Sequence, residues 1–220
     1  SSAVSGAVNS MHDSYSPLAA TVLALNLLIG GIIFGGAGTG LLAMLIFVFI
    51  AVFIAGLMSG RTPQYMGKKI TAYDIKLLVV YGVAFQVIIL LGLAITLYLP
   101  VTANGVENNG IHGISEILYA YASAMINNGS SMAGLNSNNE WYNYSLAIVM
   151  AIGRFLLIGV MLAIAGSFAE RKNTYSRLHD VQVDNGVFAF LLLFAIINVM
   201  LIFAPVLILS SVAEHLIIVN

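Results

Sequence analysis

The residues best suited to chemistry form one polar turn, Asn127-Asn128-Gly129-Ser130, in a chain that is 60% hydrophobic and 8% charged. A short apolar segment, residues 114–126, leads into the turn, and a long one, residues 144–169, follows it. Thirteen or so helical residues span only about 20 Å, which enters a membrane core of about 30 Å without crossing it. Non-helical backbone at that depth must be buried in protein or line a water-filled path. The pattern predicts a re-entrant pore helix that ends in a cation-binding turn, whose backbone carbonyls replace the water shell of the ion; an ordinary extracellular loop is the alternative.

A second possible chemistry is nucleophilic. Ser130 and Ser131 could serve an intramembrane serine hydrolase, but a serine nucleophile needs a base within reach. All 4 histidines lie outside the hydrophobic segments, so this hypothesis is remote. His112 and Glu116 share a helical face at i, i+4 spacing, and we expect such a pair near a membrane surface to be solvated rather than to bind a metal.

Composition narrows the class of protein further. A mean hydropathy of +0.99 indicates an integral protein of the lipid bilayer. The net charge of −1 offers no basic surface for nucleic acid, and the lack of cysteine excludes disulfides and thiolate metal sites. Because the chain opens in a polar run without an initiator Met, we expect a fragment of a longer protein.

The basic residues indicate the topology. Apart from Arg154, all of them fall in two loops, residues 61–76 and 170–186. The positive-inside rule places these loops in the cytoplasm, so that the polar turn faces outward. Arg154 lies within a hydrophobic segment and is expected to point into the bundle, because a charge facing lipid is unfavourable.

Residues 17–60 are too long for one straight crossing, since about forty helical residues would span roughly 60 Å. Glycines concentrate in the middle of the segment and predict a break there. With the loop orientation above, one crossing that contains an intramembrane loop fits best. The cluster at residues 35–40 lacks the lysine of a phosphate-binding loop, so either close packing of small residues or a hinge beneath the ion site would explain it.

The remaining crossings are predicted at residues 77–99, 144–169 and 187–210. A second polar stretch, Ser5-Gly6-Ala7, also precedes a long hydrophobic segment, which suggests an internal repeat. Three units follow: residues 1–76 with a filter strand and the broken helix, residues 77–169 with a complete membrane-pore-membrane repeat, and residues 170–220 with a cytoplasmic loop and the last crossing.

Several runs resemble one known family, the KdpA family of potassium-binding subunits from the Kdp potassium-transporting ATPase. The resemblance rests on residues 5–12, on the glycine-rich residues 34–41, on the distinctive run at residues 51–70 and on residues 112–120, which introduce the pore helix. It covers the whole chain and corresponds to the C-terminal part of such a protein. The nearest alternative, a Trk/Ktr-type potassium channel subunit, is disfavoured by the run from Arg61 to Ile70.

The resemblance implies an all-α integral membrane fold of membrane-pore-membrane repeats, as in the potassium channel superfamily. It implies a non-catalytic subunit of an ATP-driven potassium pump in the plasma membrane of a prokaryote, without a cofactor. The implied partners are the ATP-hydrolysing P-type subunit (KdpB) and the accessory subunits KdpC and KdpF. The implied potassium ligands are backbone carbonyls of Val4, Ser5, Gly6, Asn127, Asn128 and Gly129, and the implied gate residues are Gly35, Gly36, Gly38, Gly40 and Arg61.

Two positions depart from the family pattern. Ile126 stands where the family commonly has the first Asn of the fourth filter, which affects the expected selectivity. Gly31 stands where the family often has a carboxylate, which would remove a charge partner expected for Arg61.

Overall fold

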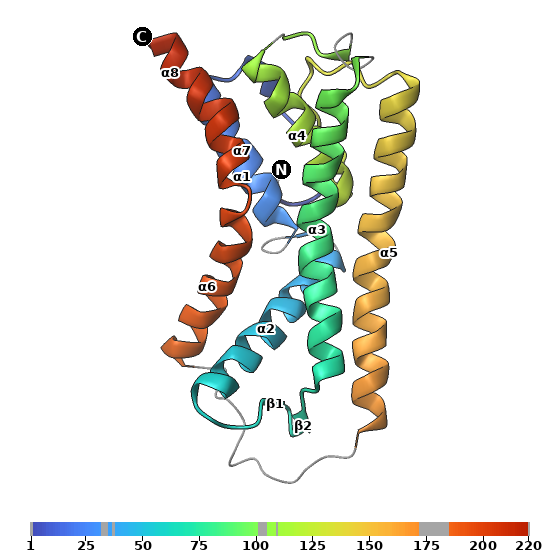
Figure 1. The fold of residues 1–220 in the computed structure, drawn as a ribbon, viewed down its shortest axis with the longest axis vertical. Helices are drawn as coiled ribbons and strands as arrows, with labels where there is room; N and C mark the ends of the chain where they lie inside the picture. The colour runs from blue at the N-terminus through green and yellow to red at the C-terminus, as the bar shows by residue number, and fades with distance from the viewer. Residues whose placement is uncertain are drawn as a thin grey trace.

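The computed structural model describes residues 2–31, 35–36, 38–100, 105–108, 110–171 and 185–219. Helices dominate these residues (Figure 1). Their bounds are α1 (Pro17–Gly30), α2 (Thr39–Met58), α3 (Ala72–Tyr98), α4 (Ile111–Met125), α5 (Glu140–Glu170), α6 (Gly186–Leu201), α7 (Ala204–Leu207) and α8 (Ala213–Val219).

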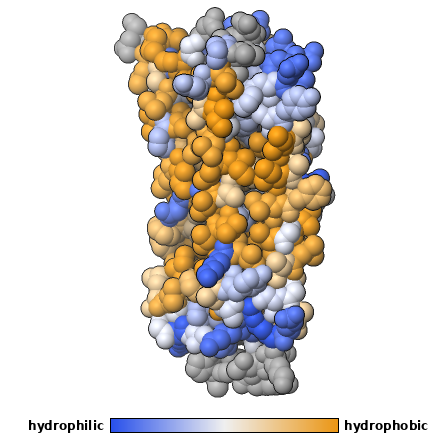
Figure 2. Space-filling view, turned by 45° about the vertical axis from the view of Figure 1, so that its right-hand side comes forward, coloured by the Kyte–Doolittle hydropathy of each residue, from blue (hydrophilic) through white to orange (hydrophobic). Residues whose placement is uncertain are grey.

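Three of these helices, α2, α3 and α5, are each long and apolar enough to cross a membrane. Figure 2 shows a broad hydrophobic band between two more polar ends. Only 33% of the most apolar window of α3 and of α5 is buried within the chain, so most of each helix faces outward. The chain is therefore an all-α membrane protein.

The helices begin where the sequence supplies caps. Thr71 and Asp74 form a capping box at the start of α3, in which each side chain bonds to the other residue's backbone. The side chains of Asn139 and Asn185 accept the backbone N–H of Tyr142 and Phe188, at the starts of α5 and α6. These polar residues define where the three helices begin, which hydropathy alone would not show.

The long segment of residues 17–60 is interrupted, as the glycines predict. The helix α1 ends at Gly30 and α2 begins at Thr39, after a non-helical break that includes Gly35, Gly36 and Gly38. Gly38 has a φ of 81°, a left-handed conformation that suits glycine. Since α2 alone has 20 residues, it is long enough for a crossing, and α1 is a shorter apolar helix before it.

The short helix α4 ends near the middle of the long helices. Its Met125 carbonyl lies so close to Gly153 of α5 that an added Cβ there would overlap it, and the ring of its Tyr121 packs on Gly92 of α3. One hydrophobic core surrounds α4, and a second packs α2 against α3, α5 and α6. Figure 1 shows α4 beside only the upper part of α3.

The basic residues Lys68 and Arg171 lie at the end of the molecule that is opposite to α4. An antiparallel hairpin of β1 (Gln64–Tyr65) and β2 (Lys68–Lys69) precedes α3, and Lys68 donates to the carbonyl of Phe168 at 2.5 Å. Arg171 pairs with the buried Asp74 at 2.6 Å and also donates to Thr71. The two predicted cytoplasmic loops therefore meet at one end, although residues 172–184 lie outside the described part.

The last predicted crossing, residues 187–210, is longer than expected and bent. The helix α6 and the segment Ala204–Val219 meet at an angle of 52°. A π-helical turn, Ile208–Val212, follows Pro205. Proline removes a backbone donor and clashes with the preceding turn, which accounts for the bend.

Candidate ion-coordination site

The polar turn after α4 is held by its backbone N–H groups. Asn127 donates to the Ala124 carbonyl at 3.0 Å and Asn128 to the Ser123 carbonyl at 2.9 Å. The N–H of Gly129 donates to the Ser123 hydroxyl at 3.1 Å. Three successive N–H groups thus point back to the last turns of α4.

The backbone φ angle alternates in sign along this turn. Asn127 has a φ of 57° and Gly129 a φ of 88°, whereas Asn128 between them stays at negative φ. Such alternation gathers successive N–H groups on one side of a strand. Because the N–H groups face α4, the carbonyls of the strand face the opposite side.

The first polar stretch repeats this backbone pattern. Val4 has a φ of 52° and Gly6 a φ of 71°, with Ser5 at negative φ between them. A positive φ is a genuine outlier for a β-branched residue such as Val4, which indicates that the surrounding structure imposes it. Two segments that are far apart in sequence therefore share one unusual conformation.

The two strands meet directly. A Cβ added to Gly6 would lie 2.5 Å from the backbone oxygen of Asn128, so only glycine fits there. Ser5 and Gly129 are exposed, whereas Asn128 is only 5% exposed. The structure thus brings together the six residues proposed as ligands, Val4 to Gly6 and Asn127 to Gly129.

The glycine break lies immediately behind both strands. A Cβ on Gly36 would lie 3.1 Å from Cβ of Val4, and one on Gly31 would lie 3.0 Å from Cγ2 of Ile126. A Cβ on Gly35 would lie 2.6 Å from Cα of Gly40, on α2, and 2.9 Å from the carbonyl oxygen of Gly30, at the end of α1. The break is therefore folded tightly on itself under the strands.

A small cavity lies beneath the two strands. Its lining includes Val4, Gly31, Asn127 and Arg154. Arg61 does not line it, because the 20 residues of α2 place Arg61 roughly 30 Å along the helix from the break. Arg154 lines the same cavity as Gly31 and is exposed at the surface of this chain.

Buried side chains connect the two strands on their outer side. Ser130 donates to Oδ1 of Asn128 at 2.6 Å, and the hydroxyl of Tyr119 lies 3.0 Å from Oγ of Ser130 and 3.2 Å from Nδ1 of His12. Because the Ser130 proton goes to Asn128, Tyr119 donates to Ser130 and His12 donates to Tyr119. The sequence does not predict this chain of hydrogen bonds, since His12 and Tyr119 are 107 residues apart.

The expectation that His112 and Glu116 are solvated is wrong. The Glu116 side chain is 0% exposed and that of His112 is 15% exposed. Burial raises the pKa of Glu116 above its ordinary value. Burial also disfavours the charged form of His112, but its hydrogen bonds to the carboxylates of Asp13 and Glu214 outweigh this and raise the pKa of His112.

The hydrolase hypothesis receives no geometric support. Ser131 is exposed, and in the described part of the chain no histidine forms a hydrogen bond with its hydroxyl. The buried neighbour Ser130 is committed to Asn128 and Tyr119.

These features define a class: an all-α membrane protein in which a helix of partial depth presents a polar backbone turn at the middle of the bundle. The sequence pattern of the potassium-transporting ATPase A subunit matches residues 1–216. The chain belongs to this family.

Curated relatives agree with this assignment. A protein of Acidobacterium capsulatum is 50% identical over 213 residues, which are 96% of this chain and 36% of the relative. Proteins of Rhodospirillum centenum and Pseudomonas entomophila are each 46% identical, over 97% and 98% of this chain and 38% of each relative. All three are named potassium-transporting ATPase potassium-binding subunits, and the chain spans little more than a third of their length.

Proposed function

We propose that this chain forms part of the potassium-binding and translocating subunit of an ATP-driven uptake pump. In this proposal potassium is selected at an outward-facing filter and then passed to an ATP-hydrolysing partner. The chain supplies two filter strands, residues 4–6 and 127–129, and α4 is the re-entrant pore helix of the last repeat.

The shared backbone conformation of the two strands carries the proposal. Residues with positive φ alternate with residues of negative φ in both strands, the positive values being at Val4 and Gly6 and at Asn127 and Gly129. With the N–H groups of the second strand turned to α4, its carbonyls are available to replace the hydration shell of a cation. The carboxyl end of α4 adds the negative end of a helix dipole at the same place, which favours a cation.

The route below the filter follows from the position of the break. Gly31 and Gly36 contact Ile126 and Val4 from behind, so an ion leaving the filter would meet the break first. We assign the gate to Gly35, Gly36, Gly38 and Gly40 of the intramembrane break, together with Arg61 at the cytoplasmic end of α2.

The names of the relatives support the remaining assignments. They are potassium-binding subunits of a potassium-transporting ATPase, a name that implies an ATPase partner. For this chain we propose an ATPase partner of the P-type (KdpB) with accessory subunits KdpC and KdpF. We also propose a location in the plasma membrane of a prokaryote, and no catalytic site within the chain.

Potassium uptake tests the filter assignment. The full-length parent protein, its Gly129→Asp variant and its Asn138→Asp variant are expressed with their partner subunits in cells that lack other potassium uptake systems. Uptake is measured at micromolar external potassium. We expect Gly129→Asp to lose potassium affinity or to admit other cations, because a carboxylate beside the carbonyls changes the field at the ion.

Asn138→Asp is the matched control, since it adds the same charge at an exposed outer position. It should transport like the parent. Equal uptake by the parent and Gly129→Asp would refute the filter assignment, and equal loss in both variants would show that outer charge alone is responsible.

A further inference from the structure

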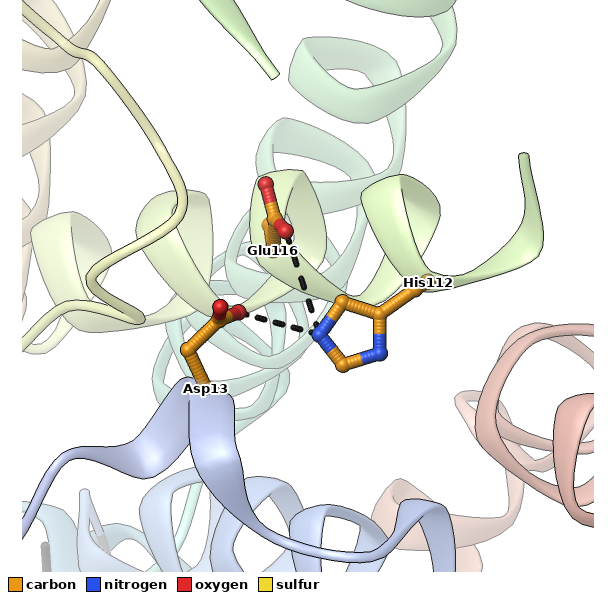
Figure 3. A group of neighbouring side chains, drawn as sticks. All are labelled: Asp13, His112 and Glu116. Carbon is orange, nitrogen blue, oxygen red and sulfur yellow. Dashed lines mark hydrogen bonds and ion pairs between the residues drawn. The ribbon is translucent and has the colours of Figure 1, made fainter. Parts of the chain in front are cut away.

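A group of metal-ligating side chains lies at the end of the molecule where α4 begins, away from the filter strands. Nε2 of His112 is 3.0 Å from Oδ1 of Asp13 and 3.8 Å from Oε1 of Glu116. One potential ligand atom from each of the three residues lies within 4.8 Å of the other two. Figure 3 shows the carboxylates of Asp13 and Glu116 converging on the same nitrogen of the ring.

The other nitrogen of His112 is already committed. Its Nδ1 lies 2.9 Å from Oε1 and 3.1 Å from Oε2 of Glu214, on α8. A carboxylate that accepts the Nδ1 proton fixes the ring and directs Nε2 toward a metal, as in carboxylate–histidine–metal triads. Glu214 thus acts as a positioning residue for the nitrogen that faces Asp13 and Glu116.

The three atoms that converge would all be electron-pair donors when His112 is neutral. Such an arrangement needs a proton, on Nε2 or on a carboxyl group, or a metal ion in its midst. Asn108 donates to Oε1 of Glu116 at 2.9 Å and to Oδ2 of Asp13 at 3.1 Å, but it brings no charge. Three carboxylates therefore surround one imidazole. If a single proton on the imidazole supplies the positive charge, the group still has a net negative charge.

A second observation points to a missing ligand. The Glu116 carboxylate is 0% exposed, and its Oε2, which points away from His112 in Figure 3, has no hydrogen-bond partner among the described residues. Gly134 lies against the cluster, and only glycine fits there, since a Cβ would lie 2.6 Å from Oε1 of Glu116 and 3.0 Å from both carboxylate oxygens of Asp13. A buried carboxylate with an unpartnered oxygen is unfavourable unless a proton or a cation neutralises it.

We propose that Asp13, His112 and Glu116 bind a divalent transition-metal ion of the zinc type, with Glu214 orienting His112. One imidazole and two carboxylates suit zinc better than calcium or magnesium, which prefer ligand sets made of oxygen alone. The partial exposure of Asp13, His112 and Glu214, between 10% and 18%, gives an ion a route from solvent. The bound ion would hold together the N-terminal segment, the start of α4 and α8.

Zinc binding to the purified full-length protein in its complex tests the proposal. Zn²⁺ is titrated calorimetrically against the parent and against His112→Gln, Asp13→Asn and Glu214→Gln. His215→Gln is the matched control, because His215 also lies on α8 but outside the cluster. We expect one Zn²⁺ per chain in the parent and in the control, no binding at this site in His112→Gln, and an affinity about 10- to 100-fold weaker in Glu214→Gln.

X-ray absorption at the zinc edge of the parent provides a readout that needs no variant. The expected spectrum has one imidazole with oxygen ligands at about 2.0–2.1 Å. Absence of stoichiometric zinc in the parent would overturn the proposal and leave only an imidazolium paired with carboxylates. Retention of zinc by a folded His112→Gln protein, or a spectrum without imidazole, would show an adventitious ion only.

Discussion

Replacing Gly6 by alanine tests whether the two proposed filter strands support each other. The substitution forces a non-glycine residue to a φ of 71°, which costs about 1–2 kcal/mol. It also places a methyl group 2.5 Å from the backbone oxygen of Asn128, where ordinary contacts begin near 3.4 Å. Overpacking of this kind costs about 1–3 kcal/mol, so the total is about 2–5 kcal/mol.

Gly129→Ala separates the two contributions. Gly129 has a φ of 88°, but among the described residues no atom lies within 4 Å of the position of an added Cβ. Its replacement should therefore cost only the conformational part, about 1–2 kcal/mol. The difference between the variants measures the crowding of the Asn128 carbonyl by the opposite strand.

Thermal unfolding of the purified full-length protein and half-saturation of potassium uptake provide the two measurements. We expect Gly6→Ala to unfold at a lower temperature than Gly129→Ala and to need more potassium for half-saturation, because it displaces a proposed ligand. If the two variants behave alike in both assays, the strands do not touch as described and the reasoning fails.

Three further predictions concern the supports of the site. Tyr119→Phe removes the hydroxyl between His12 and Ser130 and should destabilise the protein by about 1 kcal/mol in thermal unfolding. We also expect a weaker potassium affinity in uptake assays. An unchanged affinity would show that these hydrogen bonds do not hold Asn128 in place. Gly153→Ala would place a methyl group on the Met125 carbonyl and should lower the free energy of unfolding by about 1–3 kcal/mol. Gly159→Ala on the same helix meets none of the described residues within 4 Å and should leave that free energy nearly unchanged. Equal effects of the two variants on unfolding would contradict the packing of α4 on α5. Arg171→Ala leaves the buried carboxylate of Asp74 without its cation and should lower the free energy of unfolding by about 3 kcal/mol. Glu170→Ala, at the neighbouring exposed position, should have little effect. Comparable unfolding temperatures for these two variants would argue against the ion pair.

Sequence patterns predicted the parts of the fold that depend on hydropathy and on glycine. The apolar segments, the break after Gly30 and the end of α4 before Asn127 follow from composition over short windows, and the structure has them. The bend before α7 was missed because the apolar run is continuous there and Pro205 alone gave little signal. The hairpin of β1 and β2 was missed because its turn places Met66 at a φ of 51°, where asparagine or glycine would have been a clearer signal.

Contacts between distant segments could not be predicted. The spacing of His112 and Glu116 placed them on one face of a helix, but their burial depends on Asp13 and Glu214, which lie about a hundred residues away on either side. In the same way, the position of Arg154 opposite Gly31 depends on how α5 passes the break, which no local pattern encodes. Charged residues near the ends of apolar segments are therefore the positions where sequence reasoning was least informative.

The contacts of Gly31 and Gly36 with the filter strands have a mechanical consequence. Larger residues at these positions would place flexible side chains between the break and the strands, and such side chains could absorb small displacements by changing rotamer. Because glycine has no side chain, the break lies directly against the side chains of Ile126 and Val4, which are β-branched and restricted in χ1. A displacement of the break is therefore expected to displace the strands, which in the proposed function would couple release of the ion at the gate to the carbonyls that select it.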